Sequence, residues 1–271
     1  MLKQRIITAV ILLPIALIGF FLLHGLAFAL FIGVVVSLGA WEWARLAGFA
    51  AQSVRVSYAL AVAVLLGLLY LMPSLAPGLL LAGGIWWLAA TALVLTYPDS
   101  RQYWGGPVGS LVIGLLVLLP AWQALVVLKQ WPLGNWLILA VMVLVWAADI
   151  GAYFSGKRFG RRKLAPQVSP GKSWEGLVGG LLTSLLITLC VGLYRDWSAG
   201  TLLLAVLGAA VVVLISVVGD LTESMFKRSS GIKDSSQLLP GHGGVMDRID
   251  SLTAAIPVFV LLLWMAGWGS W

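Results

Sequence analysis

Half of the acidic residues in this chain lie in one short stretch near its C-terminal end. The 271 residues include only ten Asp and Glu. Five of these acids fall within residues 219–251, and they are Asp220, Glu223, Asp234, Asp247 and Asp250. Apolar runs make up most of the remaining chain, and an ionisable group close to lipid is costly enough to be treated as functional by default. Carboxylates mixed with basic residues, glycines and a histidine indicate a site for phosphates and metal.

The first polar group in this stretch fits one face of a helix. If the apolar helix before Asp220 continues, polar side chains recur at spacings i, i+3, i+4, i+7 and i+8, which lie on one face. These side chains are Asp220, Glu223, Ser224, Lys227 and Arg228. Ordinary surface pairs, such as Glu223 with Lys227, would produce the same pattern. The apolar run directly before Asp220 favours a ligand role for it, because burying a carboxylate is expensive.

The second polar group follows a glycine-rich turn at residues 241–244. Asp247 and Asp250 repeat the i, i+3 spacing there, and capping of a helix start is the competing interpretation. We expect Asp247 and Asp220 to hold one Mg²⁺ together, because this ion typically binds one or two carboxylates plus substrate phosphates. The glycines let backbone amides approach phosphate oxygens. Two roles for His242 are equally favoured by the sequence: structural support of this turn, or direct contact with phosphate.

A second polar stretch lies upstream, at residues 149–176. Asp149 ends an apolar run, and the five basic residues between 157 and 163 fit anchors at a membrane surface. The segment Ser169-Pro170-Gly171-Lys172-Ser173 differs, because it joins a tight turn, hydroxyls and a lysine just before Glu175 opens a helix. This arrangement suits a triphosphate, although the Gly-x4-Gly-Lys-Ser/Thr spacing of a P-loop is missing. We therefore expect Ser169, Lys172 and Ser173 to contact nucleotide.

Composition places these residues in a membrane protein. The chain is 61% hydrophobic with a mean hydropathy of +1.02, whereas soluble domains have about 45–50% apolar residues. Its one cysteine, Cys190, lies in an apolar run, which excludes an intrachain disulfide and a cysteine-based metal site. The net charge of +7 falls mostly in short loops between apolar runs. Such charges set membrane orientation, so no nucleic-acid partner is expected.

Apolar runs of about 20 residues predict an all-α, polytopic membrane bundle of about nine transmembrane helices. The expected spans are Ile6–Leu23, Ala27–Ala44, Val56–Met72, Leu79–Leu95, Val108–Leu128, Trp136–Phe154, Leu177–Leu193, Leu202–Leu221 and Leu252–Trp268. We divide the chain into N-terminal transmembrane helices, residues 1–135, and a C-terminal catalytic region, residues 136–271. The catalytic region is expected to carry cytoplasmic loops at residues 155–175 and 223–250.

The basic residues predict the orientation of the bundle. With nine crossings, successive loops alternate between the two sides of the membrane. Fifteen of the 17 Lys and Arg then share the side of the N-terminus, and only Lys129 and Arg195 face the other side. This asymmetry predicts a cytoplasmic N-terminus, cytoplasmic charged loops and an external C-terminus.

Residues 224–250 closely resemble the signature of the phosphatidate cytidylyltransferases, also called CDP-diacylglycerol synthases. The resemblance runs over these 27 positions. It includes Lys227, Arg228, Lys233, Asp234, Pro240, His242, Gly243, Gly244, Asp247, Arg248 and Asp250. The upstream stretch is similar at Ser169-Pro170, Lys172 and Glu175-Gly176, and the multi-span length agrees over most of the chain. Gly171 departs from the pattern, because relatives often carry a lysine there.

The resemblance implies an enzyme that transfers CMP from CTP to phosphatidate, giving CDP-diacylglycerol and pyrophosphate in phospholipid biosynthesis. It implies an active site on the cytoplasmic face of a bacterial-type inner (plasma) membrane, with Mg²⁺ as cofactor. A second, monovalent cation and a homodimer are left open. The candidate catalytic residues are Asp220, Lys227, Arg228, Asp247 and Asp250, with Asp220 and Asp247 as metal ligands. The candidate substrate contacts are Asp149, Ser169, Lys172, Ser173, Ser224, Lys233, His242 and Arg248.

Other function classes would use some of the same residues. A CTP-dependent lipid kinase would transfer only the γ-phosphate, and a cytidylyltransferase for another lipid phosphate would differ only in its acceptor. A cation-coupled transporter would also place acids within a helix bundle. The acids here gather at the predicted cytoplasmic ends of spans, away from mid-membrane, which disfavours a transporter.

Overall fold

The computed structural model describes residues 2–269, and among them nine helices are long and apolar enough to cross a membrane. The predicted helical bundle is thus confirmed. The N-terminal half contains α1 (Leu2–Leu17), the π-helical turn η1 (Ile18–Leu22), α2 (Gly25–Leu46), α3 (Gln52–Leu71), the 3-10 turn η2 (Pro73–Leu75), α4 (Ala76–Leu95), α5 (Arg101–Trp104) and α6 (Pro107–Gln130). The C-terminal half contains α7 (Gly134–Phe159), β1 (Lys163–Ala165), β2 (Ser169–Ser173), α8 (Trp174–Tyr194), α9 (Ala199–Ser229) and α10 (Met246–Met265).

The helices near the candidate site extend beyond the expected apolar runs. α9 ends at Ser229, past the expected end at Leu221, and α10 begins at Met246, ahead of the expected start at Leu252. Hydropathy marks only the part of a helix that lipid surrounds, whereas backbone hydrogen bonds continue through polar residues that form helix well. The polar side chains after Asp220 therefore lie on a regular helix, and the loop expected at residues 223–250 is shortened to residues 230–245.

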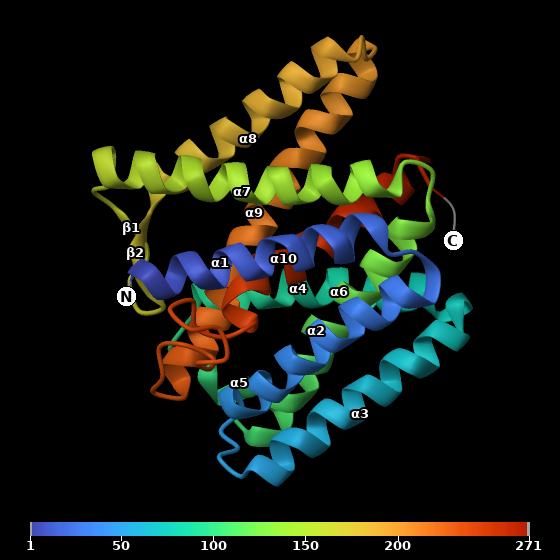
Figure 1. The fold of residues 1–271 in the computed structure, drawn as a ribbon. Coiled ribbons are helices and arrows are strands. Elements are labelled where there is room, and N and C mark those ends of the chain that lie inside the picture. The colour runs from blue at the N-terminus through green and yellow to red at the C-terminus, as the bar shows by residue number, and fades with distance from the viewer. Residues whose placement is uncertain (1, 270–271) are drawn as a thin grey trace.

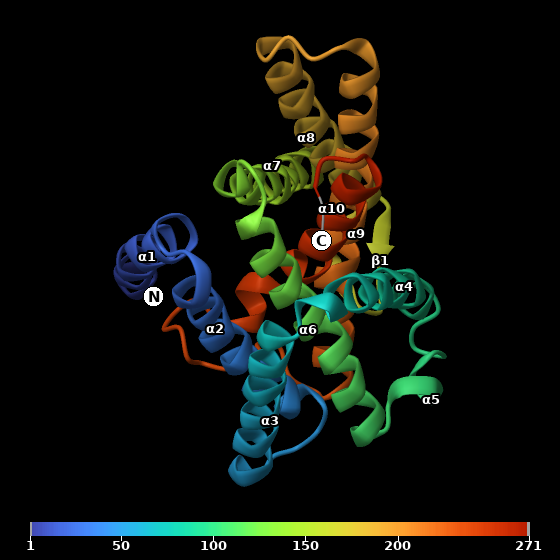
Figure 2. The same ribbon diagram turned by 90° about the vertical axis from the view of Figure 1, so that its right-hand side faces the viewer.

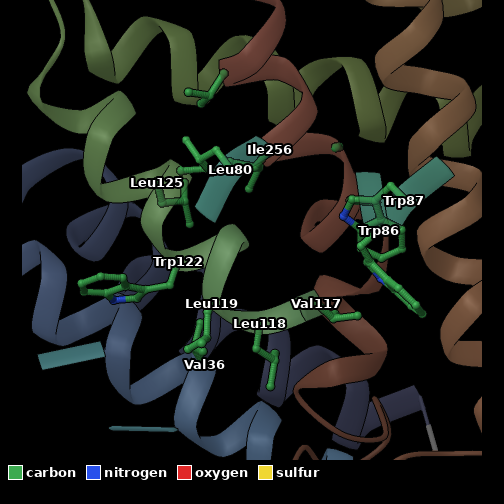
Figure 3. Packing of buried hydrophobic residues seen from close by; sticks show 14 of the residues in the cluster. Val36, Leu80, Trp86, Trp87, Val117, Leu118, Leu119, Trp122, Leu125 and Ile256 are labelled. Carbon is green, nitrogen blue, oxygen red and sulfur yellow. The ribbon is translucent and has the colours of Figure 1, made fainter. Parts of the chain in front are cut away.

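The central helix of the bundle is α6. In the most apolar 18-residue stretch of α6, 67% of the residues are buried, compared with 11% in the corresponding stretch of α3. Leu118 and Trp122 of α6 lie among the buried side chains that also include Val36 of α2, Leu80 of α4 and Ile256 of α10 (Figure 3). The view along the bundle shows α6 between α2, α3 and α4 (Figure 2). This core fixes α2 and α10 relative to one another.

One end of the bundle carries the elements that matter for the site. The N-terminal end of α1, the β1–β2 hairpin and the loop between α9 and α10 all lie at the left of Figure 1, and the C-terminal end of α10 lies toward the right. α8 and α9 form a long hairpin that leans away from the other helices (Figures 1 and 2). Leu182, Leu186 and Leu203 are exposed on this hairpin, as expected of residues that face lipid.

A short antiparallel hairpin joins α7 to α8. β1 pairs with β2, with Lys163 opposite Ser173. The carboxylate of Glu175 accepts hydrogen bonds from the backbone N–H groups of Arg161 at 3.0 Å and Arg162 at 3.2 Å. Ser173 caps α8 by accepting a hydrogen bond from the N–H of Gly176 at 3.1 Å. Both contacts attach the hairpin to the first turn of α8.

Candidate active site

The first cavity at this end of the bundle is polar and mainly basic. It has a volume of about 260 Å³ and lies between the end of α9, the loop 230–245 and the start of α10. Its lining consists of Ser224, Lys227, Arg228, Lys233, Asp234, Asp247 and Arg248. Four bases and two acids therefore surround a small space, and every one of them comes from residues 224–250. An anion with several charges suits such a lining.

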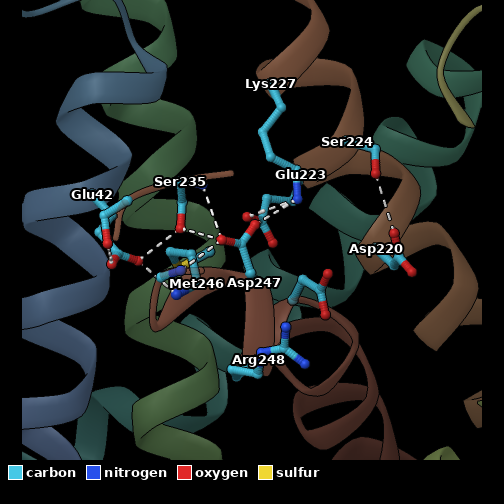
Figure 4. Close-up of polar contacts among 12 residues, drawn as sticks. Glu42, Asp220, Glu223, Ser224, Lys227, Ser235, Met246, Asp247 and Arg248 are labelled. Atoms are coloured by element: carbon cyan, nitrogen blue, oxygen red, sulfur yellow. Dashed lines mark hydrogen bonds and ion pairs between the residues drawn. The ribbon is translucent and has the colours of Figure 1, made fainter. Parts of the chain in front are cut away.

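Asp247 is the most strongly held carboxylate in this cavity (Figure 4). Its Oδ1 accepts a hydrogen bond from Nζ of Lys227 at 2.8 Å. Its Oδ2 accepts from the N–H of Ser235 at 3.0 Å, the hydroxyl of Ser235 at 2.9 Å and the N–H of Gly244 at 2.8 Å. Asp247, in the first turn of α10, is thus held by an ion pair and by hydrogen bonds from the loop, and its role as a metal ligand stays a prediction.

Lys227 lies between two carboxylates. Its Nζ is 3.3 Å from Oε1 of Glu223 and 2.8 Å from Oδ1 of Asp247, and the lysine side chain is 12% exposed. Glu223 is buried, and within the described part of the chain neither of its carboxylate oxygens has a hydrogen-bond partner. The i, i+4 pair of Glu223 and Lys227 therefore forms, but in a buried setting where the ammonium group offsets a costly charge.

Asp220 interacts with a different lysine and connects the first cavity to a second one. Its Oδ2 lies 2.7 Å from Nζ of Lys172, and its Oδ1 accepts from the hydroxyl of Ser224 at 3.2 Å. Lys172 lines a second cavity of about 210 Å³ between α7, α8, α9 and the hairpin, together with Asp149 and Ser173. The remaining lining of this cavity is largely apolar and includes Leu177, Val213 and Val217. Polar and apolar surfaces thus meet in one space.

The two predicted metal ligands have separate partners, since Asp220 pairs with Lys172 and Asp247 pairs with Lys227. Across residues 2–269 no group of three His, Cys, Asp or Glu side chains gathers in a way that would hold a metal ion. Asp250 lies within electrostatic range of Asp220 and both lysines, and its Oδ1 accepts from the N–H of Ser251 at 2.7 Å. That Asp220 and Asp247 share one ion stays a prediction.

The remaining predicted contacts differ in how close they lie to the cavities. Arg248 lines the first cavity, but its guanidinium donates to the backbone oxygen of His242 at 2.9 and 2.6 Å. Nδ1 of His242 is buried without a hydrogen-bond partner among the described residues. Ser169 pairs with Ala165 in the hairpin and lines neither of the two cavities. Arg228, which lines the first cavity, donates a hydrogen bond to the backbone oxygen of Val168, between β1 and β2, at 3.1 Å.

Known proteins are similar in sequence to this chain over nearly its whole length. The family model described as the cytidylyltransferase family matches residues 3–266. The chain belongs to the cytidylyltransferase family. A phosphatidate cytidylyltransferase of Pseudomonas aeruginosa is 74% identical over 270 residues, which cover 100% of both chains. Proteins of the same name from Haemophilus influenzae and Brucella suis are 45% and 34% identical, covering 96% of this chain and 97% and 92% of their own lengths.

This cytidylyltransferase has a further carboxylate at the site, Glu42 of α2, which lies outside both polar stretches of the sequence. Glu42 is 0% exposed and lies against the loop 230–245 (Figure 4). Its oxygens accept hydrogen bonds from the loop and from the start of α10, at the side chains of Ser235 and Ser236 and the backbone N–H groups of Val245 and Met246. The sequence does carry a signal for this residue, because an acid within an apolar span is itself a functional candidate.

Two residues of α1 also contact the loop of this cytidylyltransferase. Arg5 donates to the backbone oxygen of Gly241 at 3.1 Å, and Thr8 donates to the backbone oxygen of Pro240 at 2.9 Å. The glycine-rich turn is therefore held from the N-terminal helices as well as from α9 and α10. Its conformation depends on both halves of the chain.

Proposed function

We propose that this protein is a phosphatidate cytidylyltransferase, which transfers CMP from CTP to phosphatidate and releases pyrophosphate. One observation carries the proposal. Residues 224–250 line a basic cavity, and Asp220 connects it to a second cavity that is polar at Lys172 and apolar at Val213 and Val217. A nucleoside triphosphate suits the first environment, and a lipid phosphate with its attached glycerol and acyl chains suits the second.

The chemistry requires alignment and charge neutralisation more than proton transfer. A phosphate oxygen of phosphatidate attacks the α-phosphorus of CTP, and a new P–O bond forms. The bond from the α-phosphorus to the oxygen that bridges to the β-phosphate breaks, and this oxygen leaves on pyrophosphate. Because the attacking phosphate is already ionised, no general base is needed, and positioning and electrostatics supply the rate enhancement.

We assign the bases of the first cavity to the triphosphate. Lys227, Arg228, Lys233 and Arg248 would neutralise the phosphates of CTP and the departing pyrophosphate. Lys172 stands where the two cavities meet through Asp220, so we assign it to the phosphate that bridges the two substrates. Ser173 and Asp149 line the same cavity and are assigned to substrate positioning.

The carboxylates fit the Mg²⁺ that we propose as cofactor. Their donor atoms are hard oxygens, and Mg²⁺ is typically held by one or two carboxylates together with substrate phosphates. Asp220 and Asp247 would be these ligands, with Asp250 close by. When bound, the ion would supply charge neutralisation at the triphosphate.

We also propose that the site faces the cytoplasm, where CTP is available. Two features support this orientation. The N-terminal end of α1, the hairpin and the loop 230–245 share one end of the bundle (Figure 1), and the sequence assigns fifteen of the 17 Lys and Arg to that side. Positively charged loops are typical of cytoplasmic faces.

The proposal is tested by following the phosphorus atoms of CTP. Purified protein is incubated with phosphatidate, Mg²⁺ and CTP labelled with ³²P at the α-position, and the lipid phase is counted. We expect label in the lipid phase only when phosphatidate and Mg²⁺ are both present. Label from γ-³²P-CTP in the lipid phase would identify a lipid kinase instead. Absence of α-label from the lipid phase would overturn the proposal.

A further inference from the structure

We propose that Glu42 is a positioning residue for the transfer reaction, which holds the loop 230–245 and the first turn of α10 in the geometry that CTP binding requires. The inference rests on the proposed function. It concerns a helix of the N-terminal half, outside the signature-like residues 224–250.

The carboxylate of Glu42 is surrounded by donors from the opposite half of the chain. Oε2 accepts from the N–H of Met246 at 2.7 Å and from the hydroxyl of Ser235 at 3.0 Å. Oε1 accepts from the N–H of Val245 at 2.9 Å and from the hydroxyl of Ser236. A carboxylate offers about four lone-pair sites, so Glu42 is fully satisfied although it is completely buried. Such a group specifies one arrangement of its donors, because any other leaves a buried charge unpaired.

Ser235 connects Glu42 to Asp247. The Ser235 hydroxyl lies 3.0 Å from Oε2 of Glu42 and 2.9 Å from Oδ2 of Asp247. A hydroxyl has a single proton to donate, so the two carboxylates share it. The N–H of Ser235 also donates to Asp247 at 3.0 Å. A shift of this loop relative to α2 would therefore move Asp247, which lines the first cavity, where we propose that CTP binds.

The space around this junction leaves little freedom. A Cβ atom at Gly244 would lie 2.0 Å from Oγ of Ser235 and 2.4 Å from Oε1 of Glu42, so a side chain there would displace one of these two groups. One turn beyond Glu42, Arg45 donates to the backbone oxygen of Ser235 at 3.2 Å. Glu42 and Arg45, three positions apart on one face of α2, therefore both contact the loop.

A positioning role and a purely stabilising role make different predictions. Loss of stability alone lowers the amount of folded enzyme, and the KM values of the remaining molecules are unchanged. Displacement of the loop moves Lys233 and Asp234, which line the first cavity, the proposed site of the CTP triphosphate. It should therefore raise the KM for CTP and leave the KM for phosphatidate close to its original value.

The test is the isosteric substitution Glu42→Gln. The amide nitrogen that replaces one oxygen cannot accept from a backbone N–H. We expect the KM for CTP to rise about tenfold and kcat to fall about 10–100-fold, as for loss of an outer-sphere partner of a functional ligand. The KM for phosphatidate should stay within about twofold. Hydrogen exchange of the peptide covering residues 235–246 should become faster, whereas that of α7 and α8 should not change. Asp196→Asn, at an exposed residue of the α8–α9 turn, is the matched control and should behave as wild type.

Several outcomes would decide the matter. Wild-type KM for CTP together with wild-type exchange in Glu42→Gln would overturn the inference, and so would a fall in kcat that the folded fraction explains entirely. If wild-type protein labels no lipid but Glu42→Gln still speeds exchange of the loop, the proposed function fails while the holding role of Glu42 stands. Should Glu42→Gln not fold, Ser236→Ala removes one donor to the same carboxylate and should raise the KM for CTP about twofold to fivefold; an unchanged value would overturn the inference.

Discussion

At the scale of single residues, two carboxylates of the site each pair with a lysine from another position in the chain. Asp247 pairs with Lys227 at 2.8 Å, and Asp220 pairs with Lys172 at 2.7 Å. Ion pairs of this kind gain little net stability, because removing both charges from water is costly. Their value here is that they hold charged atoms in defined places next to a cavity. Removing one partner should therefore lower turnover, and it should also lower stability where the remaining charge is left buried and unpaired.

Asp247→Asn tests this expectation directly. The amide keeps the shape of the side chain but loses a negative charge, and one of its two polar atoms can no longer accept a hydrogen bond. We expect kcat to fall about 10²–10³-fold, comparable to the loss of one electrostatic stabiliser in an active site, in the α-³²P-CTP assay. Asp99→Asn makes the same chemical change at an exposed residue and should be neutral. Wild-type turnover by Asp247→Asn would remove Asp247 from the catalytic residues.

At the scale of elements, the β1–β2 hairpin positions Lys172 over α9. Glu175 attaches the hairpin to α8 through the backbone N–H groups of Arg161 and Arg162. In Glu175→Ala these two N–H groups lose their acceptor, and Lys172 should become less well placed. We expect kcat/KM to fall about tenfold, since even small misplacements of a positioned group are costly in rate. A matched change in Lys172→Ala, with no further loss in the double variant, would show that both substitutions act on one group.

The crossing of α9 and α10 is a second element-scale determinant. A Cβ atom at Gly219 would lie 2.6 Å from the backbone oxygen of Asp250 and 2.9 Å from Cβ of Ala254. Gly219→Ala should push the helices apart beside Asp220, with a cost of about 1–3 kcal/mol in stability and lower activity. Gly208→Ala on the same helix meets no atom within 4 Å and should be neutral. Thermal unfolding in detergent and turnover of both variants would check the prediction, and equal behaviour of the two would contradict it.

At the scale of the whole molecule, the sequence predicts the elements better than it predicts the contacts between them. The nine spans follow from apolar length, and the shared face of Asp220, Ser224 and Lys227 follows from helical spacing. Contacts between distant segments are different. Ser235 and Glu42 are 193 positions apart, and their contact depends on how α2 packs against α6 and α10. Local patterns do not contain that information, so neither the contacts of Glu42 nor the pairing of Asp220 with Lys172 could be predicted from them.

The orientation of the whole bundle leads to a prediction that does not depend on activity. In a Cys190→Ser background, a cysteine replaces either Gln237, exposed in the loop 230–245, or Gly200, at the opposite end of α9 where a Cβ meets no atom within 4 Å. Because basic loops stay in the cytoplasm, a membrane-impermeant maleimide should label Gly200→Cys but not Gln237→Cys in intact spheroplasts. Inside-out vesicles should give the reverse pattern. Labelling of Gln237→Cys from outside would place the CTP cavity on the wrong side of the membrane for its substrate, and the proposed orientation would have to be abandoned.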